Sequence, residues 1–193
     1  MSALVAEQIK RFWIDEYLTV SEALGYPRWQ LLEGVIYTMS PDKPLHSYCL
    51  NNVRAALEEQ SAGLKAHGLR AWTQSPIRVD LPLPGYPSMP EPDAALVPSQ
   101  RDPSTHPTRA VFVAEVLSQD EAVDCEIKRR IYAQLGVPEY WLIDPVKETV
   151  EVLYLEGTEY DLIACIGFKQ NPGVSLTLRS VPITIPLAAI FEA

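Results

Sequence analysis

The chain has 193 residues, 47% of them hydrophobic and 21% charged, which is typical of a globular protein with one core of ordinary size. It contains no apolar run suited to a membrane span or a secretory signal, and its three scattered cysteines form no CxxC pair, so we expect a cytoplasmic protein without a zinc site or a disulfide framework. The net charge is −9, and residues 81–145 carry ten acidic against five basic side chains, a balance that disfavours avid binding to duplex nucleic acid.

The first half of the chain predicts helices and short strands that alternate. Hydrophobic spacing indicates a helix over 4–24 and two short strands over 29–39, joined by a turn at Glu33-Gly34. A second helix begins near Leu45 and is expected to stop at Gly68. A strand over 69–81 and a proline-rich surface loop complete this half.

The second half predicts most of a central sheet. Apolar and polar residues alternate along the segment VEVLYLEGTEYDLIACI, which favours a hairpin that turns at Glu156-Gly157. The elements expected before it are strands over 93–97 and 110–117, a helix over 122–135 that ends at Gly136, and a strand over 139–144. One more short strand and a terminal helical turn should follow it. Together these patterns predict a single α/β (α+β) domain over 1–193, with a mixed central sheet flanked by helices and an extra C-terminal hairpin.

Glu115 stands inside VFVAEVL, a run that otherwise reads as a strand covered on both faces. Burying an isolated carboxylate costs several kcal/mol at least, so a buried carboxylate normally has a cation, a metal ion or hydrogen-bond donors nearby. An exposed edge position is the alternative, but the flanking residues on both strand faces are apolar. We therefore interpret Glu115 as a candidate functional residue.

Asp93 follows a proline and opens the apolar run AALV. Alone it would be an ordinary turn residue. If its strand is an antiparallel neighbour of the strand that carries Glu115, the two carboxylates can share one hard cation. Magnesium commonly takes one or two carboxylates and keeps waters for substrate phosphates, so Asp93 and Glu115 are candidate metal ligands.

Lys128 lies on the helical segment DCEIKRRIYAQLG, at the flank of an apolar stripe. Spacing alone favours a surface ion pair with Asp124 four residues earlier. The functional alternative is an ammonium that reaches the two carboxylates and stabilises charge on a phosphate. Tyr132, one turn further on, is interpreted as a packing residue, and His46 as a capping or surface residue.

Several strings together resemble the Uma-two family, whose members are assigned as endonucleases with the restriction-endonuclease-like PD-(D/E)XK fold. The resemblance rests on LLEGVIYTMSP followed by His46, on PDAALV, on VAEVLS, and on D-x-x-x-K-x-x-x-Y continuing into GVPEYWLIDP. It extends over roughly residues 17–192. It implies a restriction-endonuclease-like core with a divalent-metal nuclease site.

The resemblance also implies roles for individual residues. Asp93 matches the first acidic residue of the family motif and Glu115 the second. The superfamily lysine would fall at Leu117, and Lys128 on the following helix takes its place. His46 matches a histidine typical of the family. Where the family tends to have a glutamate in the early strand region, this chain has Gln30.

Three hypotheses follow. The first is an endonuclease that depends on magnesium or manganese and cuts DNA, with catalytic residues Asp93, Glu115, Lys128 and His46 and with two copies in a possible homodimer. The second is an inactive nuclease-fold module that binds a protein partner, which the acidity and Gln30 favour. The third is a hydrolase of smaller phosphate esters.

Overall fold

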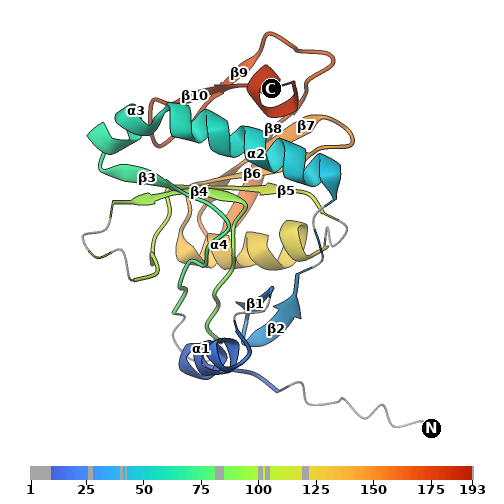
Figure 1. Cartoon of the computed structure of the whole chain (residues 1–193). Helices are drawn as coiled ribbons and strands as arrows, with labels where there is room; N and C mark the ends of the chain where they lie inside the picture. Colours follow the sequence, from blue (N-terminus) through green and yellow to red (C-terminus); the bar gives the residue numbers. More distant parts are fainter. Residues whose placement is uncertain are drawn as a thin grey trace, which may run out of the picture.

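A six-stranded mixed sheet forms the centre of the fold (Figure 1). The computed structural model describes residues 10–25, 28–39, 41, 43–80, 85–99, 102, 105–118 and 122–192. The strand order is β3-β4-β5-β6-β7-β8, with β5 and β6 parallel and the other neighbours antiparallel. The strands are β3 (Leu69–Trp72), β4 (Ala94–Pro98), β5 (Phe112–Val116), β6 (Glu139–Asp144), β7 (Thr149–Glu156) and β8 (Glu159–Gly167). The predicted mixed sheet is confirmed.

The parallel pair β5–β6 requires a crossover connection, and a helix supplies it. The crossover consists of a π-helical segment, η1 (Val123–Lys128), that continues directly into α4 (Arg129–Leu135). Gly136 ends the helix in the left-handed conformation, with φ 76°, as the sequence predicts.

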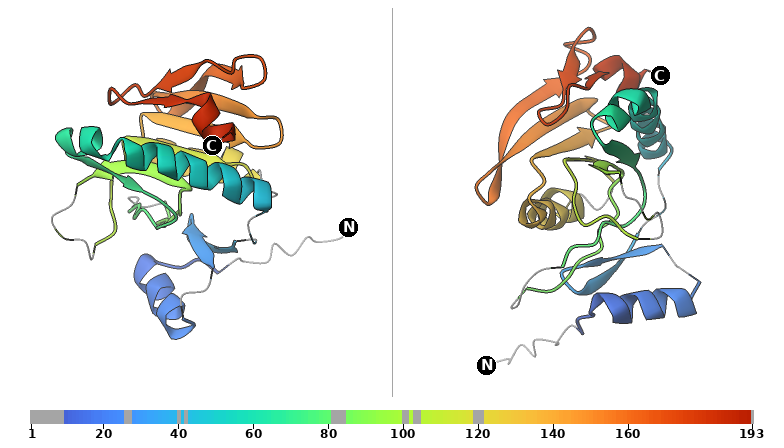
Figure 2. Two further views of the ribbon diagram at one scale, coloured as in Figure 1. Left: turned by 45° about the horizontal axis from the view of Figure 1, so that its top comes forward. Right: turned by 90° about the vertical axis from the view of Figure 1, so that its left-hand side faces the viewer.

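Helices cover both faces of the sheet (Figure 2). On one face lie α2 (Pro44–Glu59) and α3 (Ser61–Ala66), and on the other lie η1 and α4. Side chains alternate along β5: Phe112, Ala114 and Val116 pack in the core cluster below α2, whereas Val113 packs against α4. Glu115 follows the same alternation and therefore faces η1 and α4.

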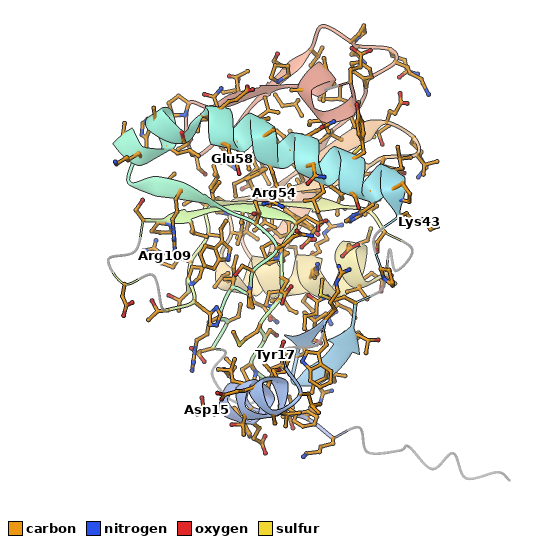
Figure 3. The ribbon with its side chains drawn as sticks, viewed as in Figure 1. Asp15, Tyr17, Lys43, Arg54, Glu58 and Arg109 are labelled. Atoms are coloured by element: carbon orange, nitrogen blue, oxygen red, sulfur yellow. The ribbon has the colours of Figure 1, made fainter. Side chains whose placement is uncertain are left out.

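A small lobe lies on the α4 side of this layered core, beyond α4 (Figure 1). It contains α1 (Ile14–Ala23) and the hairpin of β1 (Trp29–Leu32) and β2 (Val35–Thr38). Its core includes Tyr17, which points from α1 toward the hairpin (Figure 3) and donates a hydrogen bond to the Trp29 carbonyl at 3.0 Å. The guanidinium of Arg130 on α4 binds both carboxylate oxygens of Glu33, at 2.7 and 2.8 Å, and so ties the hairpin turn to the main body.

The β7–β8 hairpin is present, but it extends the central sheet rather than standing apart from it, and its two turn residues are Gly157 and Thr158. The C-terminal segment forms two strands, not one: β9 (Ser175–Thr177) and β10 (Thr184–Pro186) pair with each other. They lead into α5 (Leu187–Phe191), which packs beside α2. The amide of Asn52 on α2 donates to the Ile190 carbonyl at 3.0 Å.

Three expected elements differ in the structure. The single helix expected from Leu45 to Gly68 is divided at Gln60 into α2 and α3. The first helix begins at Ile14, because described residues 10–13 are not helical; residues 4–9 lie outside the described part. The strand expected over 69–81 ends at Trp72, because Gln74 takes a positive φ of 45° and turns the chain. No helix among the described residues is long and apolar enough to span a bilayer.

A fully buried carboxylate joins the sheet to the C-terminal segment. Glu139 accepts hydrogen bonds from the Trp141 indole and the Arg179 backbone, each at 2.7 Å. We expect Glu139→Ala to lower the free energy of unfolding by about 2–4 kcal/mol, since both donors would lose their acceptor. Urea denaturation measures this loss.

Glu139→Gln keeps one acceptor oxygen and should lose less stability. The exposed Glu159 on β8 provides the control, where Glu159→Ala should change stability by less than about 0.5 kcal/mol. Equal losses for Glu139→Ala and Glu159→Ala would contradict this role of Glu139.

Candidate active site

A pocket of about 510 Å³ opens between the β1–β2 hairpin, the N-terminal turn of α2 and the C-terminal end of β5. Its lining includes all four residues that the sequence singles out: His46, Asp93, Glu115 and Lys128. These residues come from α2, from the residue before β4, from β5 and from η1. The fold therefore brings together four residues that are far apart in the sequence.

Glu115 and Lys128 form a buried hydrogen-bonded pair at the base of the pocket. Their exposed fractions are 1% and 4%, and the distance from Lys128 Nζ to Glu115 Oε2 is 2.9 Å. The same Nζ donates to the Glu91 carbonyl at 3.1 Å and lies 3.4 Å from Asp124 Oδ1. The surface ion pair between Lys128 and Asp124 is thus corrected: the pair exists, but both side chains are buried and the ammonium also binds Glu115.

Two residues of this cluster were missed as functional candidates. Tyr132 is fully buried and donates from its hydroxyl to Glu115 Oε1 at 2.8 Å, so it does more than pack. Asp124 is 6% exposed and lies beside Lys128. The spacing D-x-x-x-K-x-x-x-Y was the available signal, because residues four apart on a helix share one face.

Asp93 lies opposite Glu115, as the expected antiparallel pairing requires. The β4–β5 register pairs Ala94 with Ala114, so one further step places Asp93 across from Glu115. Asp93 Oδ2 accepts a hydrogen bond from the Val116 backbone N–H at 2.8 Å and lies 3.4 Å from His46 Nε2. His46 is 6% exposed, so it is a buried neighbour of the carboxylate rather than a surface or purely capping residue.

Three carboxylates face one ammonium in this cluster, and the charge imbalance alters their protonation. Burial raises the pKa of Glu115 to about 8; Asp93 and Asp124 raise it further, and Lys128 opposes the shift. Burial also raises the pKa of Asp124. Burial would lower the pKa of Lys128, but the carboxylates around it outweigh that effect and raise the pKa above its usual value. Lys128 therefore stays charged at neutral pH, and the cluster has an excess of acidic groups.

The donor set fits a hard divalent cation. No group of three His, Cys, Asp or Glu side chains in the described part of the chain is arranged to hold a metal ion. Magnesium does not need such a group, because one or two carboxylates together with waters and substrate phosphates complete its shell. Asp93 and Glu115 offer two carboxylates at facing strand positions, and each carboxylate oxygen has more than one lone pair. They are the residues that could hold the cation.

Gln30 lines the same pocket and is 5% exposed. Its Oε1 accepts a hydrogen bond from the Glu91 backbone N–H at 3.2 Å. The Glu91 carbonyl accepts a hydrogen bond from Lys128, so Gln30 supports the segment that helps to hold the ammonium. A neutral amide thus occupies the place where the resemblance implies a glutamate.

Comparison with known proteins identifies the family of the chain. The model of the Uma2 family, described as "Putative restriction endonuclease", matches residues 14–188. The chain belongs to the Uma2 family. This membership confirms the family to which the sequence motifs pointed, and it supports a nuclease function.

A solved structure shares the fold of this Uma2 chain. It is a crystal structure described as "a putative nuclease belonging to DUF820" from Anabaena variabilis, with a TM-score of 0.69 and 18% sequence identity. The match covers 94% of this chain and 98% of the other. The restriction-endonuclease-like fold is therefore confirmed. No protein with a curated description matches the chain.

The raised pKa of Glu115 predicts a pH-dependent stability. The folded state keeps a proton that the unfolded state releases above pH 4.5, so the free energy of unfolding falls as pH rises from about 5 to about 8, by at most about 1.4 kcal/mol per pH unit. Glu115→Gln removes this contribution. We therefore expect the variant to gain stability relative to the wild type as pH rises across this window, as measured by urea denaturation at each pH.

Glu159→Gln on the exposed edge strand is the matched control and should follow the wild type at every pH. Parallel curves for the wild type and Glu115→Gln between pH 5 and pH 8 would show that Glu115 is not the titrating group.

Proposed function

We propose that this Uma2 protein is a metal-dependent endonuclease that hydrolyses phosphodiester bonds in DNA. The observation that carries the proposal is the convergence of Asp93, Glu115 and Lys128 in one pocket of a chain from this family. Asp93 and Glu115 would hold magnesium or manganese. When bound, the cation supplies charge neutralisation at the phosphate and lowers the pKa of a water molecule.

The protein residues have distinct tasks in this proposal. Lys128 keeps its charge and stabilises the negative charge that develops on the scissile phosphate. Tyr132 and Lys128 bind the two oxygens of Glu115 and fix the direction in which this carboxylate faces the pocket. His46 and the Val116 backbone N–H both contact Oδ2 of Asp93 and so hold this carboxylate in place. We further propose a cytoplasmic homodimer, because two copies related by a two-fold axis cut both strands of a duplex most simply.

A second function has its own support. Gln30 replaces a carboxylate that the resemblance implies, and both oxygens of Glu115 already have donors from the protein. These features also fit an inactive nuclease-fold module that binds a protein partner. Such a module would cut no DNA under any metal condition and would co-purify with a stable partner from native lysate.

Cleavage of DNA tests the primary proposal. Supercoiled plasmid, linear duplex and single strands are incubated with magnesium, with manganese and with chelator. We expect metal-dependent cutting by the wild type and none by Glu115→Gln, which loses the anionic ligand but keeps a similar shape. Lys128→Met should cut about a hundred to a thousand times more slowly, since one charge-stabilising donor is lost.

Circular dichroism and thermal unfolding establish that each variant is folded. Undiminished cutting by a purified, folded Glu115→Gln protein would refute the metal-ligand assignment. Cutting of oligonucleotides or nucleotides but of no long DNA would favour the hydrolase of smaller phosphate esters.

Tyr132 is expected to affect the metal requirement through Glu115. Tyr132→Phe should raise the magnesium concentration for half-maximal cutting roughly 10- to 100-fold, because it removes the hydrogen bond that orients the ligand. Titration of magnesium in the cleavage assay measures the shift.

Tyr160→Phe is the matched control, since Tyr160 is also buried but donates to the Val137 carbonyl outside the pocket. It should lose stability without changing the metal requirement. Equal magnesium requirements for Tyr132→Phe and the wild type would show that Tyr132 does not position the ligand.

A further inference from the structure

The pocket carries apolar surface that hydrolysis of a phosphate does not require. One side of the pocket is lined by Ile36 and Tyr37 of β2 and by Met39 just after this strand. The rim is lined by Leu45 and Val146. Leu45 is 46% exposed and Val146 77% exposed, so this surface is open to solvent. Exposed apolar side chains beside a charged cluster indicate a ligand that has an apolar part next to its charge.

The depth of the cluster limits how a phosphate can reach it. Glu115, Lys128 and Asp124 are each less than a tenth exposed, so a scissile phosphate has to enter the pocket. Its own sugar and the adjoining base must then enter the pocket or lie on its rim. In a duplex those bases are paired with the other strand and stacked on their neighbours, so they cannot contact the rim. An unpaired base can stack on an aromatic or apolar side chain.

The cations around the pocket are few. Besides buried Lys128, the described lining residues include one further lysine and one arginine, Lys43 and Arg28, and both are exposed. Lys43 stands at the N-terminal end of α2 (Figure 3). Proteins that grip duplex DNA through its backbone typically contact about six to ten phosphates, so two cations fit a short segment of one strand.

From these observations, and resting on the proposed nuclease function, we propose that the pocket takes an unpaired segment of a single DNA strand. Bases of this segment contact Tyr37, Leu45 and Val146, and its phosphates pass Lys43 toward Asp93 and Glu115. The preferred substrates are therefore single strands and the unpaired regions of otherwise paired DNA.

One labelled oligonucleotide tests the substrate class in three forms: as a single strand, as a fully paired duplex and as the same duplex with a central unpaired bubble. With magnesium, cuts should fall in the single strand and in the bubble. The paired duplex should be cut about a hundredfold more slowly, because its strands must first unpair and unstack. Cutting of the paired duplex at the same rate as the single strand would overturn the inference.

Binding in the presence of chelator provides a readout that does not depend on cleavage. Fluorescence anisotropy should show tighter binding of the single strand than of the duplex. With two phosphate contacts, the logarithm of the association constant should fall with the logarithm of salt concentration at a slope of about −1.4. Equal binding of both forms would count against an unpaired substrate.

Two variants with matched controls locate the contact. Val146→Asp and Lys43→Glu should each weaken binding of the single strand roughly tenfold. Leu162→Asp and Lys65→Glu place the same new charges at exposed positions on β8 and α3 and should leave binding unchanged. Equal effects at the rim and at the control positions would refute a specific contact at the pocket.

The outcomes separate this inference from the proposed function. Preferential binding of the single strand at the rim, with no cleavage of any form, would overturn the nuclease activity and support the binding site. Cleavage that Glu115→Gln abolishes, with no preference for unpaired DNA, would support the activity and overturn the substrate class.

Discussion

The buried pair of Glu115 and Lys128 is the interaction on which the candidate site depends. Burying the Lys128 ammonium beside a carboxyl group costs several kcal/mol, and the structure offsets this cost only by supplying partners on every side. Lys128 has the Glu115 carboxylate, the Glu91 carbonyl and Asp124 around its ammonium, and Tyr132 donates to the second oxygen of Glu115. The crossover between the parallel strands β5 and β6 makes this possible, because it lays η1 and α4 over the face toward which Glu115 points. The position of the crossover in the fold therefore determines which side chains surround Glu115.

The small lobe forms one wall of the pocket and contacts the Lys128 site through the backbone of Glu91. Gln30 on β1 binds the N–H of Glu91, and the carbonyl of the same residue binds Lys128. The bidentate contact between Arg130 and Glu33 fixes the hairpin against α4 from outside. Displacement of the hairpin would thus alter both the wall of the pocket and one of the partners of the ammonium. The lobe therefore supports the candidate site, although it supplies none of the proposed metal ligands.

The sequence predicted the sheet, most elements and four residues that line the pocket, His46, Asp93, Glu115 and Lys128. Glu115 interrupts an apolar strand, and Asp93 precedes a strand that could pair with it, so both were visible as anomalies of polarity. The burial of Lys128 could not be predicted from spacing, because an ideal helical wheel places it at the flank of the apolar stripe. In the π-helical segment and the turn after it, Asp124, Lys128 and Tyr132 all face the sheet. Partners such as the Glu91 carbonyl and the Val116 N–H belong to the backbone, which carries no residue-specific signal.

The structure shows where the acidic residues of the chain lie, which their number in the sequence does not. Among the ten acidic residues of the stretch 81–145, Glu115, Asp124, Glu139 and Asp144 are buried. Their charges point into the site, toward the C-terminal segment or into a turn, where Asp144 accepts hydrogen bonds from the Val146 and Lys147 backbones. Glu139 and Asp144 do not line the pocket, so the acidic groups that a nucleic acid strand meets there are chiefly Asp93, Glu115 and Asp124, beside Lys128. In the proposed complex, the small number of cations at the rim limits the length of strand that the pocket can hold, and the apolar rim favours an unpaired strand.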